Sequence, residues 1–119
     1  MSRRRNPEDS LPLKPKPFLL LLVLQQDGPL HGYAIKKQML ERSGGRVAMD
    51  PGGLYRLIAR LERDGMVEGA PRPADDPDER RQYVAITEWG RAVLAAESRR
   101  ISELAQMPAV QELAREARG

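Results

Sequence analysis

The residues in this sequence with the most specific chemistry are arginines that follow a glycine pair at the start of a helix. Residues 50–63 read DPGGLYRLIARLER. Arg56 and Arg60 are one helical turn apart, so they share a face from which guanidinium groups can contact guanine edges or phosphates. Gly52 and Gly53 let the backbone approach a ligand closely, and the free N–H groups at a helix start favour phosphate. The alternative is that the glycines ease tight packing and the arginines aid solubility.

Charge is distributed unevenly along the chain, whose net charge is +3. Residues 1–60 contain 11 lysines and arginines against 5 acids, whereas residues 61–119 contain 9 against 12. A basic N-terminal half favours a polyanion or an acidic surface as partner. Solvated lysines and arginines with no partner would give the same count, so the charge alone leaves both interpretations open.

Several function classes are excluded by composition. The chain has no cysteine and one histidine, so it has no disulfide framework and no thiolate nucleophile, and we expect no metal site. It contains no nucleophile–base pair and no glycine-rich phosphate loop, so we expect neither an enzyme nor a cofactor. The longest apolar run, residues 18–24, is too short to span a bilayer, and a charged, proline-rich gap before it argues against a secretory signal. We therefore expect a cytoplasmic protein without a membrane partner.

The 119 residues suit one domain that is mostly α with a small β-hairpin. Residues 1–17 hold four prolines and five basic residues and predict a flexible basic arm. Periodicity, capping residues and breakers then predict helices and strands. The predicted helices lie at residues 18–26, 32–42, 51–64, 88–106 and 109–117, with Pro108 breaking the fourth. The predicted strands lie at residues 47–49, 66–68 and 82–86.

This order of elements is typical of a winged helix-turn-helix. In that fold the third helix enters the major groove of DNA and the hairpin flanks it. We assign residues 18–86 to this domain and residues 87–119 to a C-terminal helical segment that forms a dimer. The basic arm, residues 1–17, either reaches along DNA or only aids solubility.

Between residues 18 and 97 the chain resembles PadR-type transcriptional regulators. The motifs that carry the resemblance are GPLHGYAIKKQM at 28–39, DPGGLYRLIARLERDGMVE at 50–68 and RRQYVAITEWGRAVL at 80–94. The resemblance implies a ligand-responsive dimeric repressor in which the helix after the wing pairs two subunits. Two positions depart from the family's pattern, because Gly53 stands where a threonine is usual and Gln82 where the first of two tyrosines often lies.

The candidate DNA-binding residues come from all three parts of the winged domain. They are Tyr33, Lys36, Gly52, Gly53, Tyr55, Arg56, Arg60, Arg80 and Arg81. By resemblance Tyr55 contacts a phosphate, although a half-buried structural tyrosine is the alternative. Tyr33 could equally pack in the core, Lys36 could lie on a solvated face, and His31 is interpreted as a helix-capping group.

The loop between the two predicted hairpin strands carries four acids that a phosphate backbone would repel. These acids are Asp75, Asp76, Asp78 and Glu79. We therefore expect the tip of the wing to stay off DNA, and we expect Arg72, Arg80 and Arg81 at its base to be the contacts. The single tryptophan, Trp89, is predicted to pack against the wing or the arm.

Dimerisation is predicted through a narrow seam on the fourth helix. Its residues are Leu94, Ser98, Ile101, Leu104 and Ala105. A twofold dimer would place two recognition helices about 34 Å apart, one DNA turn, to bind a palindrome. The alternative is that Val110, Leu113 and Ala117 fold back over the seam within one chain.

The sequence thus predicts a transcriptional regulator that binds double-stranded DNA as a homodimer, with a small-molecule effector implied by the resemblance. A second class stays open: a winged-helix protein-interaction module that does not bind DNA. The acidic wing favours that second class.

Overall fold

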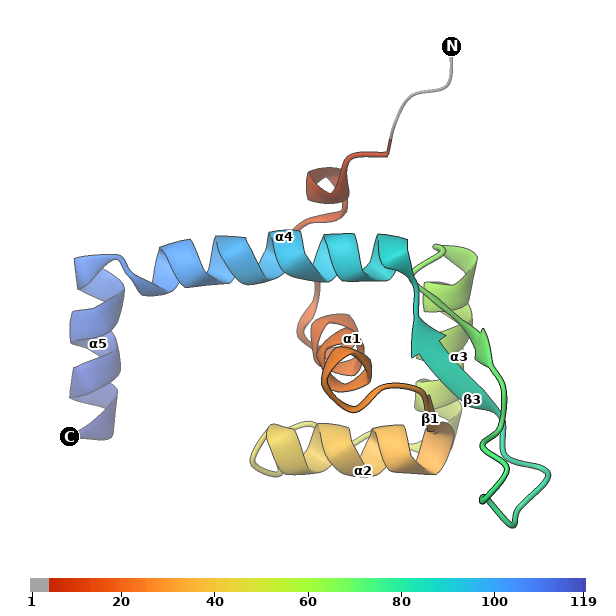
Figure 1. Ribbon diagram of the computed structural model, residues 1–119. Coiled ribbons are helices and arrows are strands. Elements are labelled where there is room, and N and C mark those ends of the chain that lie inside the picture. The colour runs from red at the N-terminus through yellow and green to blue at the C-terminus, as the bar shows by residue number, and fades with distance from the viewer. Residues whose placement is uncertain (1–4) are drawn as a thin grey trace.

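The chain folds into helices with one small sheet, and the computed structural model describes residues 5–119 (Figure 1). Part of the predicted basic arm, including Arg3 and Arg4, lies outside the described residues. The elements in chain order are η1 (Pro7–Ser10), α1 (Pro15–Asp27), β1 (Leu30–His31), α2 (Gly32–Arg42), α3 (Pro51–Arg63), β2 (Val67–Ala70), β3 (Tyr83–Ile86), α4 (Glu88–Ala105) and α5 (Pro108–Arg118). They confirm the predicted fold class. Among residues 5–119, no helix is both long and apolar enough to cross a bilayer.

The ends of the helices follow from local chemistry. Helix α1 begins at Pro15 rather than at the predicted Phe18, because a proline in a first turn needs no hydrogen-bond donor of its own. It ends at Asp27 and is followed by Gly28, whose φ of 78° lies in the left-handed region that glycine adopts without strain. His31 caps α2 as predicted, since its Nδ1 accepts a hydrogen bond from the N–H of Ala34 at 3.4 Å.

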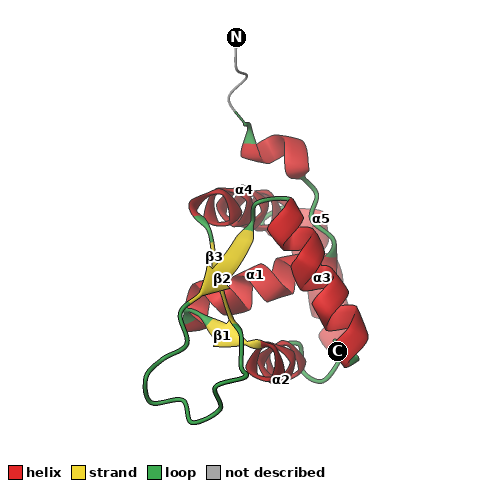
Figure 2. Cartoon of the chain, turned by 90° about the vertical axis from the view of Figure 1, so that its right-hand side faces the viewer, coloured by secondary structure: helices red, strands yellow, loops and turns green. Residues whose placement is uncertain are grey.

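The sheet has three strands in the order β1-β3-β2, all antiparallel. Val67 of β2 pairs with Ile86 of β3, and Leu30 of β1 pairs with Val84 on the other side. The predicted strand at 47–49 is wrong. Those residues run as irregular chain, and the strand that pairs with the hairpin comes from the connection between α1 and α2 instead, because that connection lies along the free edge of β3. Figure 2 shows the long loop between β2 and β3 extending beyond the sheet.

Apolar residues from the helices and the sheet form one core. Its members include Leu20, Leu21, Leu24, Ile35, Met39, Leu54, Leu57, Ile58, Leu61, Val84, Val93 and Leu94. Gly90 allows the first turn of α4 to lie directly on the backbone of Met66, just before β2, and on Ile86 of β3. A Cβ atom at Gly90 would overlap the carbonyl oxygen of Met66 and would lie 2.9 Å from Cγ1 of Ile86, closer than atoms can approach.

The segment before α1 is held against α4, so the prediction of a flexible arm is wrong for residues 5–14. Helix η1 packs on α4, and the N–H of Leu13 donates to Oε2 of Glu97 at 2.5 Å. The guanidinium of Arg5 lies 4.7 Å from the ring centroid of Trp89, a cation–π distance, which confirms that Trp89 packs against the arm. Glu97 is 1% exposed, and a buried carboxylate requires hydrogen-bond partners; the segment supplies one through Leu13, and Arg100 of α4 supplies another.

Helix α4 leaves the domain body, and α5 turns sharply after Met107 and stands apart from α1 and α2 (Figure 1). All residues from 101 to 119 are exposed. Val110, Leu113 and Ala117 therefore do not fold back over the predicted seam. The prediction that Leu94 belongs to the dimer seam is wrong. Leu94 is 4% exposed and packs in the core of its own chain.

Candidate nucleic-acid interface

Helix α3 is strongly amphipathic, and this fixes the direction of its arginines. Leu54, Leu57, Ile58 and Leu61 are buried. Arg56 and Arg63 are two turns apart, so both project from the opposite, exposed face. Arg63 is not among the residues predicted from the sequence to bind DNA, although its spacing of seven from Arg56 places it on the same face of the helix.

The start of α3 is a capped turn in which both glycines have close neighbours. Oδ2 of Asp50 accepts a hydrogen bond from the N–H of Gly53 at 3.1 Å. This bond lowers the pKa of Asp50 below its ordinary value. A Cβ atom at Gly53 would lie 2.8 Å from Oδ1 of Asp50, and one at Gly52 would lie 3.2 Å from a terminal nitrogen of Arg56. The glycines thus leave room for the cap and for Arg56 to fold over the first turn.

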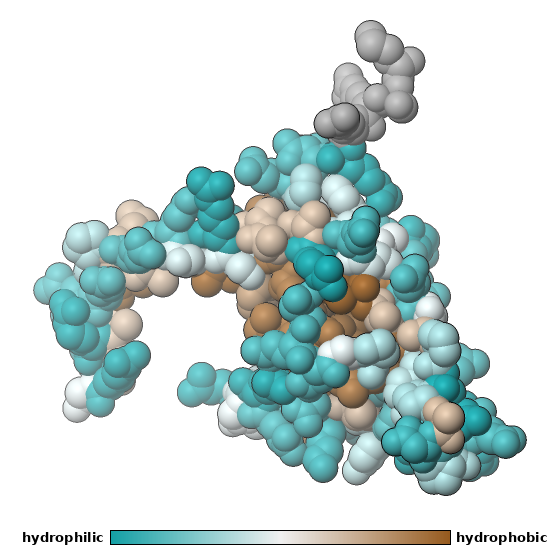
Figure 3. Space-filling view, viewed as in Figure 1, coloured by the Kyte–Doolittle hydropathy of each residue, from teal (hydrophilic) through white to brown (hydrophobic). Residues whose placement is uncertain are grey.

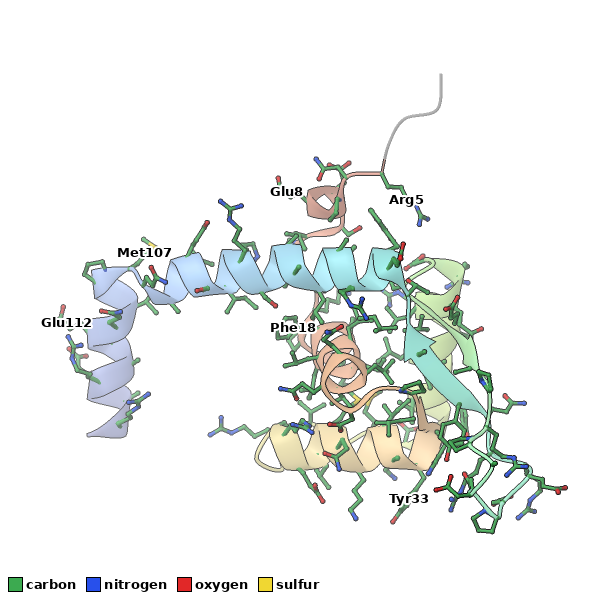
Figure 4. The ribbon with its side chains drawn as sticks, viewed as in Figure 1. Arg5, Glu8, Phe18, Tyr33, Met107 and Glu112 are labelled. Atoms are coloured by element: carbon green, nitrogen blue, oxygen red, sulfur yellow. The ribbon has the colours of Figure 1, made fainter. Side chains whose placement is uncertain are left out.

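On the wing side of α3, residues from three elements meet around one shallow hollow. Tyr33 of α2 is 72% exposed and Tyr55 of α3 is 64% exposed. Figure 4 shows Tyr33 pointing away from the body of the domain. Together with Arg80 and Arg81 at the end of the wing loop, these tyrosines line a hollow of about 400 Å³. The high exposure of Tyr33 excludes the core position that was its alternative.

On the other side of α3, a larger groove separates it from the start of α1. This groove, of about 910 Å³, is lined by Lys14, Lys16, Arg56, Arg60 and Arg63, with Asp50 as its acid. Arg60 therefore points toward α1 and away from the wing. The sequence placed both lysines in a flexible arm, but they stand at the fixed start of a helix.

Lys36 is half-buried on α2 and lines neither the wing-side hollow nor the α1-side groove. The structure therefore brings most of the candidate residues to the two flanks and the outer face of α3 but leaves Lys36 apart. Within residues 5–119, no three side chains of the metal-binding types His, Cys, Asp and Glu gather into a possible metal site.

The wing loop is folded by its own charges. Asp76 is 7% exposed, which corrects the expectation that it lies at an exposed tip. The O–H of Tyr83 donates to Oδ2 of Asp76 at 2.5 Å. A terminal nitrogen of Arg81 donates to Oδ1 at 3.2 Å, and the N–H of Asp78 donates to the same oxygen at 2.9 Å. The Arg72 guanidinium donates to the backbone carbonyl of Asp76.

These contacts change both the titration and the availability of the wing residues. The Tyr83 hydroxyl, followed by the N–H of Asp78, lowers the pKa of Asp76, and the same bond raises the pKa of Tyr83. The Arg81 side chain is 41% exposed and pairs within the loop, so it is less available for DNA than expected. The Arg80 side chain is 92% exposed and forms an ion pair with Asp78, at 3.3 Å.

Comparison with known proteins finds similarity to transcriptional regulators in both sequence and structure. Residues 20–96 match the family described as "Transcriptional regulator PadR-like family". The chain is similar to transcriptional regulator Rv3488 of Mycobacterium tuberculosis, with 42% identity over 80 residues, which are 67% of this chain and 70% of that protein. It is also similar to an uncharacterised 37.1 kDa protein in transposon TN4556 of Streptomyces fradiae, with 37% identity over 86 residues, which are 72% of this chain.

The chain spans only 23% of the length of that Streptomyces protein. Among solved structures, the fold is similar to a mutant of MarR from E. coli complexed with operator DNA. The TM-score is 0.64 and the identity is 25%, and the match covers 91% of this chain and 66% of the other.

Proposed function

Because the chain belongs to the PadR-like family of transcriptional regulators, we propose that it is a dimeric repressor that binds a palindromic operator in double-stranded DNA and responds to a small-molecule effector. The effector rests on the family resemblance alone. A regulator of this kind acts where the chromosome is, so the proposed compartment is the cytoplasm.

One observation carries the proposal of DNA binding: cations lie along both flanks of the exposed face of α3. Lys14, Lys16 and Arg60 lie on the α1 side, and Arg80 lies on the wing side with Tyr33 and Tyr55. A helix placed in the major groove has a phosphate backbone on each side. Two cationic flanks around an arginine-bearing helix match that arrangement. Similarity to a regulator solved with operator DNA supports the same proposal.

We propose that the dimer forms through the end of α4 and through α5. Ser98 and Ala105 are exposed, and so are the larger apolar residues on this part of the chain, Ile101, Leu104, Met107, Val110 and Leu113, at 39–63%. Figure 3 shows apolar side chains along the hollow between α5 and the body. A soluble chain that exposes a contiguous apolar surface commonly covers it with a partner, and the proposed partner is a second copy of the chain.

The test begins by selecting a duplex from a random-sequence pool with the wild-type chain. Fluorescence anisotropy then measures binding of that duplex, and of a scrambled duplex of the same composition, between about 50 and about 200 mM salt. We expect tighter binding to the selected duplex and a steep loss of affinity with salt. Recovery of no enriched sequence, together with binding that does not change with salt, would contradict the proposal.

The same experiment distinguishes the alternative of a protein-interaction module without DNA binding. The observation that favours this alternative is the number of acidic residues in the sequence of the wing loop. Since the carboxylates of Asp76 and Asp78 are paired within the loop, the wing presents fewer free acids than its sequence suggests, which favours DNA binding.

A further inference from the structure

The wing loop contains a run of acids next to the basic side chains that are candidates for DNA contact. If these acids were equivalent, each would weaken DNA binding by repelling phosphate. They differ in environment, however, because Asp75 is exposed whereas Asp76 is 7% exposed. The buried member is surrounded by three donors to its carboxylate, from Tyr83, Arg81 and the backbone of Asp78.

We propose that Asp76 is a positioning residue for DNA binding, which folds the wing loop so that Arg80 is presented beside Tyr33 and Tyr55. This inference rests on the proposed function. The chain of contacts runs from the loop to the DNA-facing surface without a gap. Asp76 holds the hydroxyl of Tyr83, and the ring of Tyr83 lies edge-on to His31 at 5.4 Å.

The contacts continue from His31 to the exposed tyrosine of α2. The ring of His31 is stacked with that of Tyr33 at 6.5 Å between centroids, and the same histidine caps α2 through the N–H of Ala34. A movement of Tyr83 would therefore displace His31 and Tyr33 as well as the loop. The carboxylate of Asp76 thus controls two parts of the surface, the wing end and the start of α2.

The backbone next to Arg80 is fixed by the same set of bonds. The N–H of Asp78 donates to Asp76, and Oδ1 of Asp78 in turn accepts the N–H of Arg80 at 3.0 Å. Arg72 donates to the carbonyl of Asp76 from the other end of the loop. Without the carboxylate of Asp76, Arg81 and Tyr83 lose their shared partner, and the order of the loop around Arg80 is lost with it.

The experiment compares neighbouring substitutions that remove the same charge, Asp76→Ala and Asp75→Ala, with the wild-type chain on the selected duplex. If Asp76 positions the wing, Asp76→Ala weakens binding by roughly tenfold, as expected for the loss of a charge-assisted contact in each subunit. Asp75→Ala leaves binding unchanged or strengthens it by at most about fivefold, because it removes only a screened repulsion. Tyr83→Phe should weaken binding in the same direction as Asp76→Ala, and combining the two should add little.

The salt dependence separates lost positioning from a general loss of fold. Asp76→Ala should reduce the slope of log affinity against log salt by about one unit for each phosphate contact that Arg80 no longer makes. Its thermal midpoint should fall below that of Asp75→Ala, because three hydrogen bonds to a buried carboxylate are lost, but the chain should stay folded at the temperature of the binding assay. If the wild type binds the duplex and Asp76→Ala binds as tightly as Asp75→Ala, the positioning role is overturned.

Two readouts do not depend on DNA and keep the inference separate from the proposed function. Hydrogen exchange at the N–H of Asp78 should accelerate in Asp76→Ala and stay unchanged in Asp75→Ala. In a spectroscopic titration, the raised pKa of one tyrosine should return toward its ordinary value in Asp76→Ala only. If neither readout changes, the hydrogen bonds by which Asp76 folds the wing loop are refuted. If both change but the wild type fails to bind any duplex, the proposed function and the positioning role are both wrong, and only the role of Asp76 in folding the loop remains.

Discussion

Glu97 offers the sharpest test of how the N-terminal segment is attached. Its buried carboxylate accepts the N–H of Leu13 at 2.5 Å and a hydrogen bond from the guanidinium of Arg100. Substitution by glutamine keeps the size of the side chain but removes its charge. Hydrogen bonds to charged groups contribute about 1.5–3 kcal/mol each. The bond to Arg100 is partly screened by solvent, because the Arg100 side chain is 39% exposed, so we expect Glu97→Gln to cost about 2–3 kcal/mol in total.

The loss should be visible in thermal unfolding, where roughly 4 °C per kcal/mol applies to a chain of this size. We therefore expect the midpoint of Glu97→Gln to fall by about 8–12 °C. The matched control is Glu103→Gln on the same helix, whose carboxylate is 67% exposed and pairs with Arg99. An exposed pair of this kind contributes little, so the control should unfold close to the wild type.

The effect of Glu97 should also depend on pH in a defined direction. The bond from Arg100, opposed by burial and assisted by the N–H of Leu13, lowers the pKa of Glu97 in the folded chain. A depressed pKa contributes stability that is fully present above the unfolded value, about 4.3, and that is lost as pH falls through the folded value. The difference in unfolding free energy between wild type and Glu97→Gln should be constant near neutrality and shrink below about pH 4. A difference that persists unchanged at the acid end, or a Glu97→Gln midpoint equal to that of Glu103→Gln, would refute this reasoning.

The other predictions concern the recognition helix, the packing of α4 and the dimer. Arg56→Ala and Arg63→Ala should each weaken binding to the selected duplex by about 1–3 kcal/mol if they contact bases, with unchanged thermal midpoints, and wild-type affinity in either would mean that the outer face of α3 is not the DNA face. Gly90→Ala should destabilise the chain by about 1–3 kcal/mol in denaturant unfolding, because its Cβ meets backbone that cannot move away; a neutral result would contradict the packing of α4 on Met66 and Ile86. Ile101→Glu with Leu104→Glu should convert a dimer to a monomer in sedimentation, because each charge would be buried without a partner. A wild type that is already monomeric at micromolar concentration would rule out this interface.

The parts of the fold that were predicted from sequence are those set by local signals. Asp50 followed by Pro51 marks the start of α3, and Gly65 follows its end, because capping, proline and glycine each act within one turn. The apolar spacing from Leu54 to Leu61 is another local signal, and the residues at this spacing form the buried face of α3. The short strand Leu30–His31 could not be predicted, because two residues carry no periodicity and pair only after β3 is in place.

The misplacement of Leu94 has a physical cause in the length of α4. The spacing of Leu94 and Ile101 does define one stripe on the helix. The first part of that stripe lies against the chain's own domain, where Leu94 is 4% exposed, and the later part has left the domain, where Ile101 is 39% exposed. Periodicity identifies the apolar face of a helix, but it does not identify the residue at which the rest of the domain stops covering that face.

The two buried acids were missed for a related reason. Glu97 lies in a helix rich in charged residues, and Asp76 lies in a loop rich in them, so neither differs from its exposed neighbours in sequence. Their burial depends on donors far along the chain or across the loop, at Leu13 and at Tyr83. A tertiary hydrogen bond of this kind leaves no local pattern.

The most direct test of the central claim is a methylation-protection footprint of the wild-type chain on its selected duplex. Dimethyl sulfate modifies guanine N7 in the major groove and adenine N3 in the minor groove, so it reports which groove is occupied. If α3 lies in the major groove of two half-sites, guanine N7 should be protected in two segments whose centres are about 10 base pairs apart. Arg56→Ala should lose part of that protection. Protection confined to adenine N3, or protection of one segment without a second, would contradict binding by a dimer that places both α3 helices in the major groove.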